Sequence, residues 1–564
     1  MLITLFAWLY ISFSCEIWGS LIIHLLNKIG DKQQVKSINF SLTCFLGLSA
    51  ITVVASFLSL FMPLGGLSFQ LILLLLTIAF LFFKPSRAFF ARLKKPFGGL
   101  HFSLVFLFIS YLIMLLIMST WTINHPDTLS YHAQTIQWIE KYRAVPGLAN
   151  LHMRYGLQNL WFVACAVFNF KFINLDGLTF INSTILVWYF IFILQKINEN
   201  ISSGNKRLNA FLWLALAAIS ISGYTQVRLT ATSASSDFVA TICVWTVFFL
   251  FLDRSEHGKR NIDWILITVL SFFAITLKLS VLPIILAALY ATYKLFQKRQ
   301  IRSLTISCLI AILIITPYFA RNIISSGYVL FPSPHPNIAN VDWKVDKEKT
   351  YVQRDYILAY ARNPGELTRQ EIKNEVAMKL SQWLPLWWKK QSLPDKISIS
   401  LMVLAFIALL IKIKAVINSA EIGKTALIIS IAGCIFWFAQ APDPRFGFGF
   451  IIGLPAVIAA ILLLPAIKNN EFFTRRILIA FNLVFAVTLA VYDCYRLKNF
   501  FSPQQIVQPL GIEKIPFNTT QYNGIDIRVP EANEPCGDIQ APCTYDLKSF
   551  IPRGDKITDG FKEH

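Results

Sequence analysis

The sequence predicts an all-α polytopic membrane protein. Of its 564 residues, 55% are hydrophobic and only 15% are charged, and its mean hydropathy is +0.57, too apolar for a soluble protein of this length. Apolar runs of about 17 to 25 residues, long enough for a helix to cross about 30 Å of hydrocarbon, recur along the chain. Helices are expected because lipid offers no partner to an open backbone group.

About fourteen runs are candidate membrane spans. The shorter apolar stretch 155–170 contains Gln158 and Asn159, so we expect a re-entrant or surface helix there. The predicted spans lie near residues 2–26, 40–62, 67–83, 102–120, 178–196, 208–222, 237–252, 262–277, 281–296, 302–319, 398–411, 425–440, 447–467 and 476–493.

The spacing of the spans divides the chain into five regions. These are N-terminal accessory helices (1–101), a transmembrane core (102–319) with a first outer loop (121–177), a large outer loop with surface helices (320–397), C-terminal helices (398–494) and an extramembrane tail (495–564).

The formal charge of +20 does not require nucleic acid, because the basic residues are dispersed among short loops between spans. Membrane proteins concentrate such residues on the cytoplasmic side. If 155–170 does not span, the basic loops all fall on that side, near 28–36, 84–95, 196–207, 254–260, 294–302, 412–424 and 468–476. We therefore expect a bacterial cytoplasmic membrane protein with both termini and the three long segments outside.

Cys536 and Cys543 lie in the polar tail, which this topology places in an oxidising compartment. We predict a disulfide between them. Two free thiols are the alternative.

The first outer loop offers a candidate general base. In HPDTLSYH, Pro126 suits a first helical turn, so a helix is expected to start at Asp127. Tyr131, Gln134 and Trp138 would share its face, with His132 beside them. A carboxylate in a first turn is held ionised by the helix dipole and can accept a proton from a hydroxyl. The alternative is that Asp127 only starts the helix.

A second outer acid, Asp237, begins a predicted span after Ser235 and Ser236. Helix capping alone would explain it. Its expected depth, at the same interface as Asp127, also favours a role in the same site.

Four cations occupy outer span ends, where the charge bias disfavours them: Arg228, Lys278, Arg321 and Arg445. Each alone could reach lipid headgroups. Together they favour a phosphate site, because charge near hydrocarbon is costly unless paired and arginine grips phosphate with two nitrogens.

The order of these motifs resembles the GT-C superfamily of integral membrane glycosyltransferases, which includes protein mannosyltransferases and lipid A aminoarabinose transferases. Residues 102–467 carry the resemblance, through HPDTLSYH and GLANLHMRYGLQNLW, then the acidic SSDF, the basic TLKLS, TPYFARNIISSGYVLFPSP and the late PDPRFGF. Three extra spans precede the family's usual first one. Asp127 stands alone where many relatives have two adjacent acids.

The resemblance implies transfer of a sugar from a polyprenyl-phosphate donor to a glycan, lipid or protein acceptor of the cell envelope. Asp127 would be the general base, with Asp237 as a second catalytic candidate. Lys278, Arg321 and Arg445 would hold the donor phosphate, with Arg228 and His132 as secondary phosphate ligands. Tyr131, Gln134 and Asp443 are candidate substrate contacts. No cofactor and no metal ligand is predicted, although a divalent metal is left open.

Two other functions remain as alternatives. An O-antigen-type polymerase or ligase would use the same kind of donor but rely on outer-loop Arg and His residues. A glycolipid transporter or flippase would show ionisable residues near mid-membrane and internal repeats. Walker-type, HExxH and GxSxG motifs do not occur in the sequence, which gives ATP-driven pumping and common hydrolase chemistry no support.

Overall fold

The computed structural model describes residues 1–29, 38–82, 99–203, 223–253, 259–365, 367–462, 471–522, 524–531, 534–545, 547 and 550–564. Ten helices in these ranges are long and apolar enough to cross a membrane. They are α1 (Leu2–Ile29), α2 (Phe40–Leu58), α5 (Phe102–Ser119), α9 (Phe180–Ser203), η6 with α14 (Leu279–Ile284, Ile285–Gln297), α15 (Ile301–Ser326), α19 (Leu393–Ile411), α21 (Glu421–Gln440), α22 (Pro444–Leu462) and α24 (Glu471–Phe500).

Three shorter apolar helices coincide with further predicted spans: α3 (Leu67–Leu81), α12 (Asp237–Leu252) and α13 (Asn261–Leu277). The predicted span 208–222 lies outside the described residues. The prediction of a multi-pass helical membrane protein is thus confirmed.

The stretch 155–170 does not form a spanning helix. It contains α8 (Leu160–Val167), flanked by the 3-10 turns η3 (Met153–Gly156) and η4 (Lys171–Ile173). A helix of eight residues is about 12 Å long, less than half the hydrocarbon thickness. The expectation of a non-spanning segment is confirmed.

Several predicted span ends differ from the ends of the helices, and two of them bear on the site and the tail. Helix α15 continues past residue 319 to Ser326 and ends at Gly327, whose φ of 81° suits a left-handed C-cap. Arg321 and Asn322 look like a loop start in sequence, yet both are buried and hydrogen-bonded inside the protein. Helix α24 likewise continues to Phe500, so the tail begins later than predicted.

The N-terminal helices pack tightly against the core. Helices α1 and α2 approach so closely that a Cβ at Gly47 would lie 1.7 Å from the Cys15 carbonyl oxygen. The indole of Trp8 on α1 donates to Ser183 Oγ on α9 at 2.8 Å. The indole of Trp188 on α9 donates back to Ser12 Oγ, also at 2.8 Å. Such hydrogen bonds stabilise helix pairs in lipid, where apolar surface alone provides no driving force.

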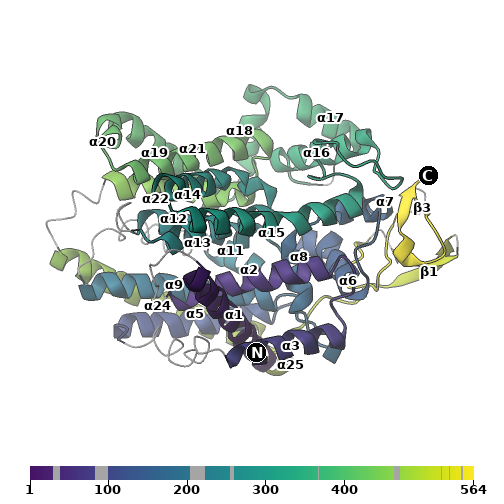
Figure 1. Cartoon of the computed structure of the whole chain (residues 1–564), viewed down its shortest axis with the longest axis horizontal. Helices are drawn as coiled ribbons and strands as arrows, with labels where there is room; N and C mark the ends of the chain where they lie inside the picture. The colour runs from purple at the N-terminus through teal and green to yellow at the C-terminus, as the bar shows by residue number, and fades with distance from the viewer. Residues whose placement is uncertain are drawn as a thin grey trace.

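Contacts between helix ends fall into two sets. One set joins predicted outer ends, as in Arg321 Nη1 to Ser59 Oγ (2.7 Å) and Gln505 Nε2 to Thr120 Oγ1 (3.0 Å). The other joins predicted inner ends, as in Lys294 to Glu421 (2.9 Å) and Asn261 Nδ2 to Gln300 Oε1 (2.8 Å). In Figure 1, β1 and β3 lie at one end of the long axis and α20 (Ile413–Ile417) at the other.

The layer at the predicted outer end of the helices is built from three segments of the chain. The first contributes η2 (Thr128–His132), α6 (Ala133–Lys141) and α7 (Leu148–Leu151), and the second contributes α16 (Lys347–Arg362), α17 (Arg369–Ala377) and α18 (Leu380–Lys390). The tail contributes α25 (Gln504–Val507), η8 (Ile557–Asp559) and two antiparallel hairpins, β1 (Phe517–Tyr522) with β2 (Ile525–Pro530) and β3 (Phe550–Pro552) with β4 (Phe561–Glu563).

The tail is docked on the first outer segment through a small apolar core of its own. Trp138 and Tyr155 of that segment pack with Ile527, Phe550 and Phe561 of the tail. A close backbone contact adds to this core: Phe561 N donates to Pro146 O at 3.0 Å. Gly147, beside it, has φ 65°, and a Cβ there would meet the Phe561 carbonyl oxygen at 1.8 Å. Cys536 and Cys543 form a disulfide within the tail, the pairing predicted from the sequence.

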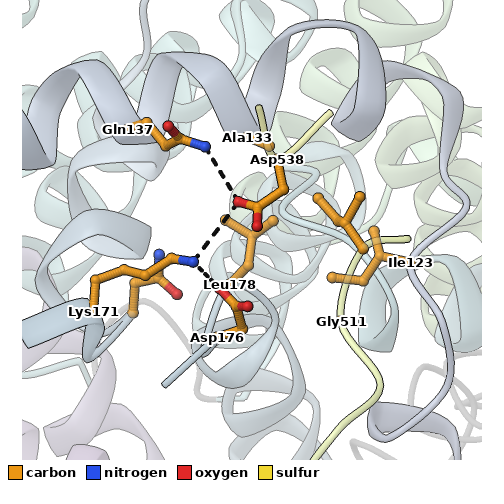
Figure 2. A pocket seen from close by; sticks show the side chains of 10 residues that line it. Ile123, Ala133, Gln137, Lys171, Asp176, Leu178, Gly511 and Asp538 are labelled. Carbon is orange, nitrogen blue, oxygen red and sulfur yellow. Dashed lines mark hydrogen bonds and ion pairs between the residues drawn. The ribbon is translucent and has the colours of Figure 1, made fainter. Parts of the chain in front are cut away.

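A polar contact fixes the same junction, as Figure 2 shows. Asp538 of the tail accepts from Gln137 Nε2 at 3.2 Å and lies 3.7 Å from the Lys171 ammonium, which also pairs with Asp176. The cavity among them is only about 10 Å³. That volume suits a single water molecule, so this contact is structural.

The buried carboxyl of Glu140, on α6, makes the stability of the protein depend on pH. Burial raises the pKa of its carboxyl to about 7, although the Asn169 amide, which donates to it at 2.6 Å, opposes the shift. The folded protein therefore binds one more proton than the unfolded chain between about pH 4.5 and 7, so stability falls as pH rises through that window.

We expect Glu140→Gln to raise the thermal unfolding midpoint at pH 8 and to change it little at pH 5. Differential scanning fluorimetry of the detergent-solubilised protein at both pH values measures this. An equal shift at the two pH values would contradict a protonated Glu140 in the folded state.

Candidate active site

The site is built on a short turn before α22. Asp443 Oδ1 accepts from Arg445 N at 3.0 Å, and Pro444 occupies the first helical position. The turn is fixed by two indoles, since Trp437 Nε1 donates to Asp443 O at 2.7 Å and Trp387 Nε1 donates to Pro442 O at 2.8 Å. The Arg445 side chain is thereby held at one outer helix end.

Asp127 lies at the start of a π-helical turn. It directly precedes η2, and α6 continues from Ala133. His125 Nδ1 accepts from Thr128 N at 3.3 Å, and Thr128 Oγ1 contacts His132 Nδ1 at 3.1 Å. The wider π turn shifts the register by one residue relative to a regular α-helix.

Part of the predicted polar face contacts the tail. The Gln134 amide nitrogen donates to Ile539 O at 2.5 Å and Gly537 O at 3.3 Å. Trp138 packs on Phe561. Gln134 therefore anchors the tail instead of lining the site. Tyr131, whose ring lies edge-on to those of His132 and Phe162, remains beside Asp127.

Asp237 and Lys278 come from two neighbouring helix ends. Asp237 is in the first turn of α12, where the helix dipole stabilises a carboxylate. Lys278 follows α13 with an extended backbone, at a helix C-terminus that favours a cation. Their side chains form an ion pair, and the Lys278 ammonium lies 3.9 Å from the centre of the Phe446 ring.

These groups converge on Arg445. Its Nη1 contacts Asp127 Oδ2 at 2.9 Å, and its Nε lies 3.0 Å from Asp443 Oδ2 and 3.9 Å from Asp237 Oδ2. We call Asp127, Asp237, Lys278, Asp443 and Arg445 the outer cluster. Each of these side chains exposes between 16% and 27% of its surface, so the cluster is enclosed but reachable.

The environment controls protonation in the first outer segment. Burial alone would raise the pKa of the Asp127 carboxyl. The nearby Arg445 guanidinium and, more weakly, other cationic groups around it lower that pKa below its ordinary value. Burial lowers the pKa of His132 to about 3 and also lowers that of His125. At neutral pH Asp127 is therefore ionised, while both imidazoles are neutral. In that form His132, predicted as a secondary phosphate ligand, could contact a phosphate by hydrogen bonding.

Helix α16 covers the outer cluster with two tyrosines. The Arg445 guanidinium lies 5.8 Å from the Tyr360 ring centre, and that of Arg154 lies 5.1 Å from the Tyr356 ring centre. The two tyrosine rings stack on one another at 6.1 Å. Arg154 also donates to Ser130 Oγ at 2.8 Å, three residues from Asp127. Arg154, Tyr356 and Tyr360 were not predicted as site residues, although Arg154 lies in the segment GLANLHMRYGLQNLW.

Two predicted phosphate ligands lie outside the ion pairs of the outer cluster. Arg321 is buried and donates to Ser59 Oγ at 2.7 Å and Gln158 Oε1 at 2.9 Å, which join α15 to the C-cap of α2 and to the segment between η3 and α8. Arg228 is half-buried on α11 (Gly223–Ala231). Within the described ranges, no group of three or more His, Cys, Asp or Glu residues has the arrangement of a metal site.

The fold and the outer cluster define a class: a multi-pass helical membrane protein with a partly exposed acid–base cluster at one end of its helices. Residues 1–452 match the family described as Domain of unknown function (DUF8201), and the chain belongs to this family. The comparisons with curated proteins and with solved structures found no match.

Proposed function

We propose that this protein is a glycosyltransferase that moves a sugar from a polyprenyl-phosphate donor to a cell-envelope acceptor on the outer face of the cytoplasmic membrane. The observation that carries the proposal is the ion pair between Asp127 and Arg445, residues 318 positions apart. A carboxylate able to act as a base lies beside cations able to hold a phosphate, which supports a reaction on a lipid-linked phosphate donor.

The proposed reaction exchanges one bond for another. The acceptor hydroxyl gives its proton to the Asp127 carboxylate as its oxygen forms a bond to the anomeric carbon. The bond from that carbon to the donor phosphate oxygen breaks, and polyprenyl phosphate leaves with the electron pair. Arg445 and Lys278 stabilise the charge that develops on the departing phosphate.

Phosphate binding also tunes the base. Without donor, Arg445 neutralises Asp127 and keeps its pKa low, so the carboxylate is a weak base. A donor phosphate competes for the same guanidinium, since arginine binds phosphate and carboxylate through the same fork. Losing that partner raises the pKa of Asp127, because burial then outweighs the remaining cations, and makes the carboxylate more basic when substrate is present.

Asp237 and Asp443 act as positioning residues in this account. Asp237 holds the Lys278 ammonium, and Asp443 holds the Arg445 guanidinium through its Nε. Tyr356 and Tyr360 cover the two arginines, which excludes water from the reacting phosphate.

A deletion strain tests the proposal. We expect its envelope glycans to lack one sugar and its lipid extract to accumulate that sugar linked to polyprenyl phosphate, both measured by mass spectrometry. Complementation with the intact chain restores the parental profile. Unchanged glycans without donor accumulation would rule out sugar transfer by this protein.

A further inference from the structure

A second site lies away from the outer cluster. The tail and the end of α6 enclose an open groove of about 730 Å³. Its walls are the β1–β2 hairpin, the segments 540–542 and 555–558, and Lys141 with Tyr142. We call it the tail groove. Its volume is within the range of about 300 to 1,000 Å³ typical of ligand sites.

The lining is polar, and not all of its polar side chains have partners within the protein. Among the described residues, the side chains of Lys141, Asp526 and Asp555 have neither a hydrogen-bond nor an ion-pair partner within the protein. Gln521 and Gln540 add exposed amides. A groove of unused donors and acceptors suits a ligand that carries both, as a hydroxyl group does.

The balance of charges in the groove lining argues against a strongly anionic ligand. Three cations, Lys141, Arg528 and Lys556, face two carboxylates, Asp526 and Asp555. This near balance does not create the strong positive potential that a phosphate-rich polymer requires. Tyr142 supplies the aromatic surface in the lining, supported by the Trp138 ring at 5.1 Å. A sugar ring has an apolar face and a polar edge. The Tyr142 ring can stack on the apolar face, and the amides and charged groups can hydrogen-bond to the polar edge.

The tail groove is rigidly connected to the outer cluster. Helix α6 ends at Lys141, and the same helical segment begins with Asp127, fourteen residues earlier or about 21 Å along a helix. Two contacts fix the tail to that helix: Gln134 donates to Ile539 O, and Gln137 donates to Asp538, as Figure 2 shows. A chain bound in the groove could thus extend to the cluster.

We propose that the tail groove binds an oligosaccharide, the distal part of the acceptor glycan. The role as acceptor site rests on the proposed sugar transfer, whereas binding itself does not. Lys141 and Gln521 donate hydrogen bonds to the chain, Asp526 accepts them from its hydroxyl groups, and Tyr142 stacks on it, which holds the chain while its end reaches Asp127.

Binding is measured with the full chain in nanodiscs by isothermal titration calorimetry. The probes are a neutral hexose oligomer and a uronic-acid oligomer, each of about six units, an extended peptide and inorganic phosphate. We expect at least one oligosaccharide to bind. Lys141→Ala with Gln521→Ala, and Tyr142→Ala, weaken this binding at least about tenfold, while Tyr142→Phe retains it. Lys514→Ala, an exposed tail lysine outside the groove, is the matched control.

The outcomes separate the two proposals. Binding of the peptide or phosphate alone, or oligosaccharide binding unaffected by the groove variants, overturns the groove assignment and leaves sugar transfer untouched. Asp127→Asn is expected to keep oligosaccharide binding. If transfer also persists in that variant, sugar transfer with Asp127 as base fails while the binding result stands.

Discussion

Asp127→Asn should reduce sugar transfer by about 10² to 10⁴-fold, the range that loss of a general base produces. The asparagine side chain has nearly the same shape but cannot take a proton from an acceptor hydroxyl. Arg445 keeps Asp443 as a partner at 3.0 Å, so we expect the variant to fold with a small change in thermal stability. Transfer is assayed in membranes with the donor that accumulates in the deletion strain.

The matched control is Asp355→Asn, an acid on the outer helix α16 that pairs with Arg354 and does not belong to the outer cluster. This variant should transfer sugar at the normal rate. If Asp127→Asn kept more than half of the normal rate while remaining folded, Asp127 would not be the base.

Arg445→Ala should abolish transfer and also destabilise the protein. It leaves the Asp127 and Asp443 carboxylates without their shared cation, within a cluster that also contains Asp237. Removing one partner of a buried pair costs about 3 to 5 kcal/mol. Because Arg445 exposes 21% of its side chain, we expect the lower end of that range. Thermal unfolding measures the loss, and Arg354→Ala, from an exposed pair, is the control.

The pH dependence distinguishes this cause from a packing defect. In the native protein the lowered pKa of Asp127 contributes stability that is present above the ordinary carboxyl pKa and lost as pH falls through the lowered one. Without Arg445, burial dominates and raises that pKa, which reverses the slope. Arg445→Ala should therefore be less destabilised at pH 5 than at pH 8. Equal destabilisation at both values would point to lost packing.

The sequence predicted the outer cluster better than its surroundings. Asp237, Lys278 and Arg445 each sit at a helix end whose apolar run is easy to locate, so one interface could be expected to bring them near Asp127. Arg321 does not follow this expectation. Helix α15 continues beyond it, and its side chain binds the C-cap of α2 and the segment between η3 and α8 instead.

Other features depend on tertiary structure that periodicity cannot show. The π turn after Asp127 changes the helical register by one residue, and Gln134 contacts the tail. A regular helical pattern in the sequence gives no sign of such a change. Tyr356 and Tyr360 come from a surface helix with no sequence signal for where it docks. The tail groove needs two segments about 400 residues apart to meet, which no local motif predicts.

The central claim is that the outer cluster catalyses the formation of a glycosidic bond. Reconstituted proteoliposomes test this claim most directly. They would contain isotope-labelled lipid extract and envelope acceptor from the deletion strain. Sugar transfer predicts that label moves from lipid to acceptor with an equal amount of polyprenyl phosphate released, and that Asp127→Asn stops both. Labelled lipid that only changes leaflet, with its sugar still attached and no new bond formed, would contradict the claim and identify a transporter.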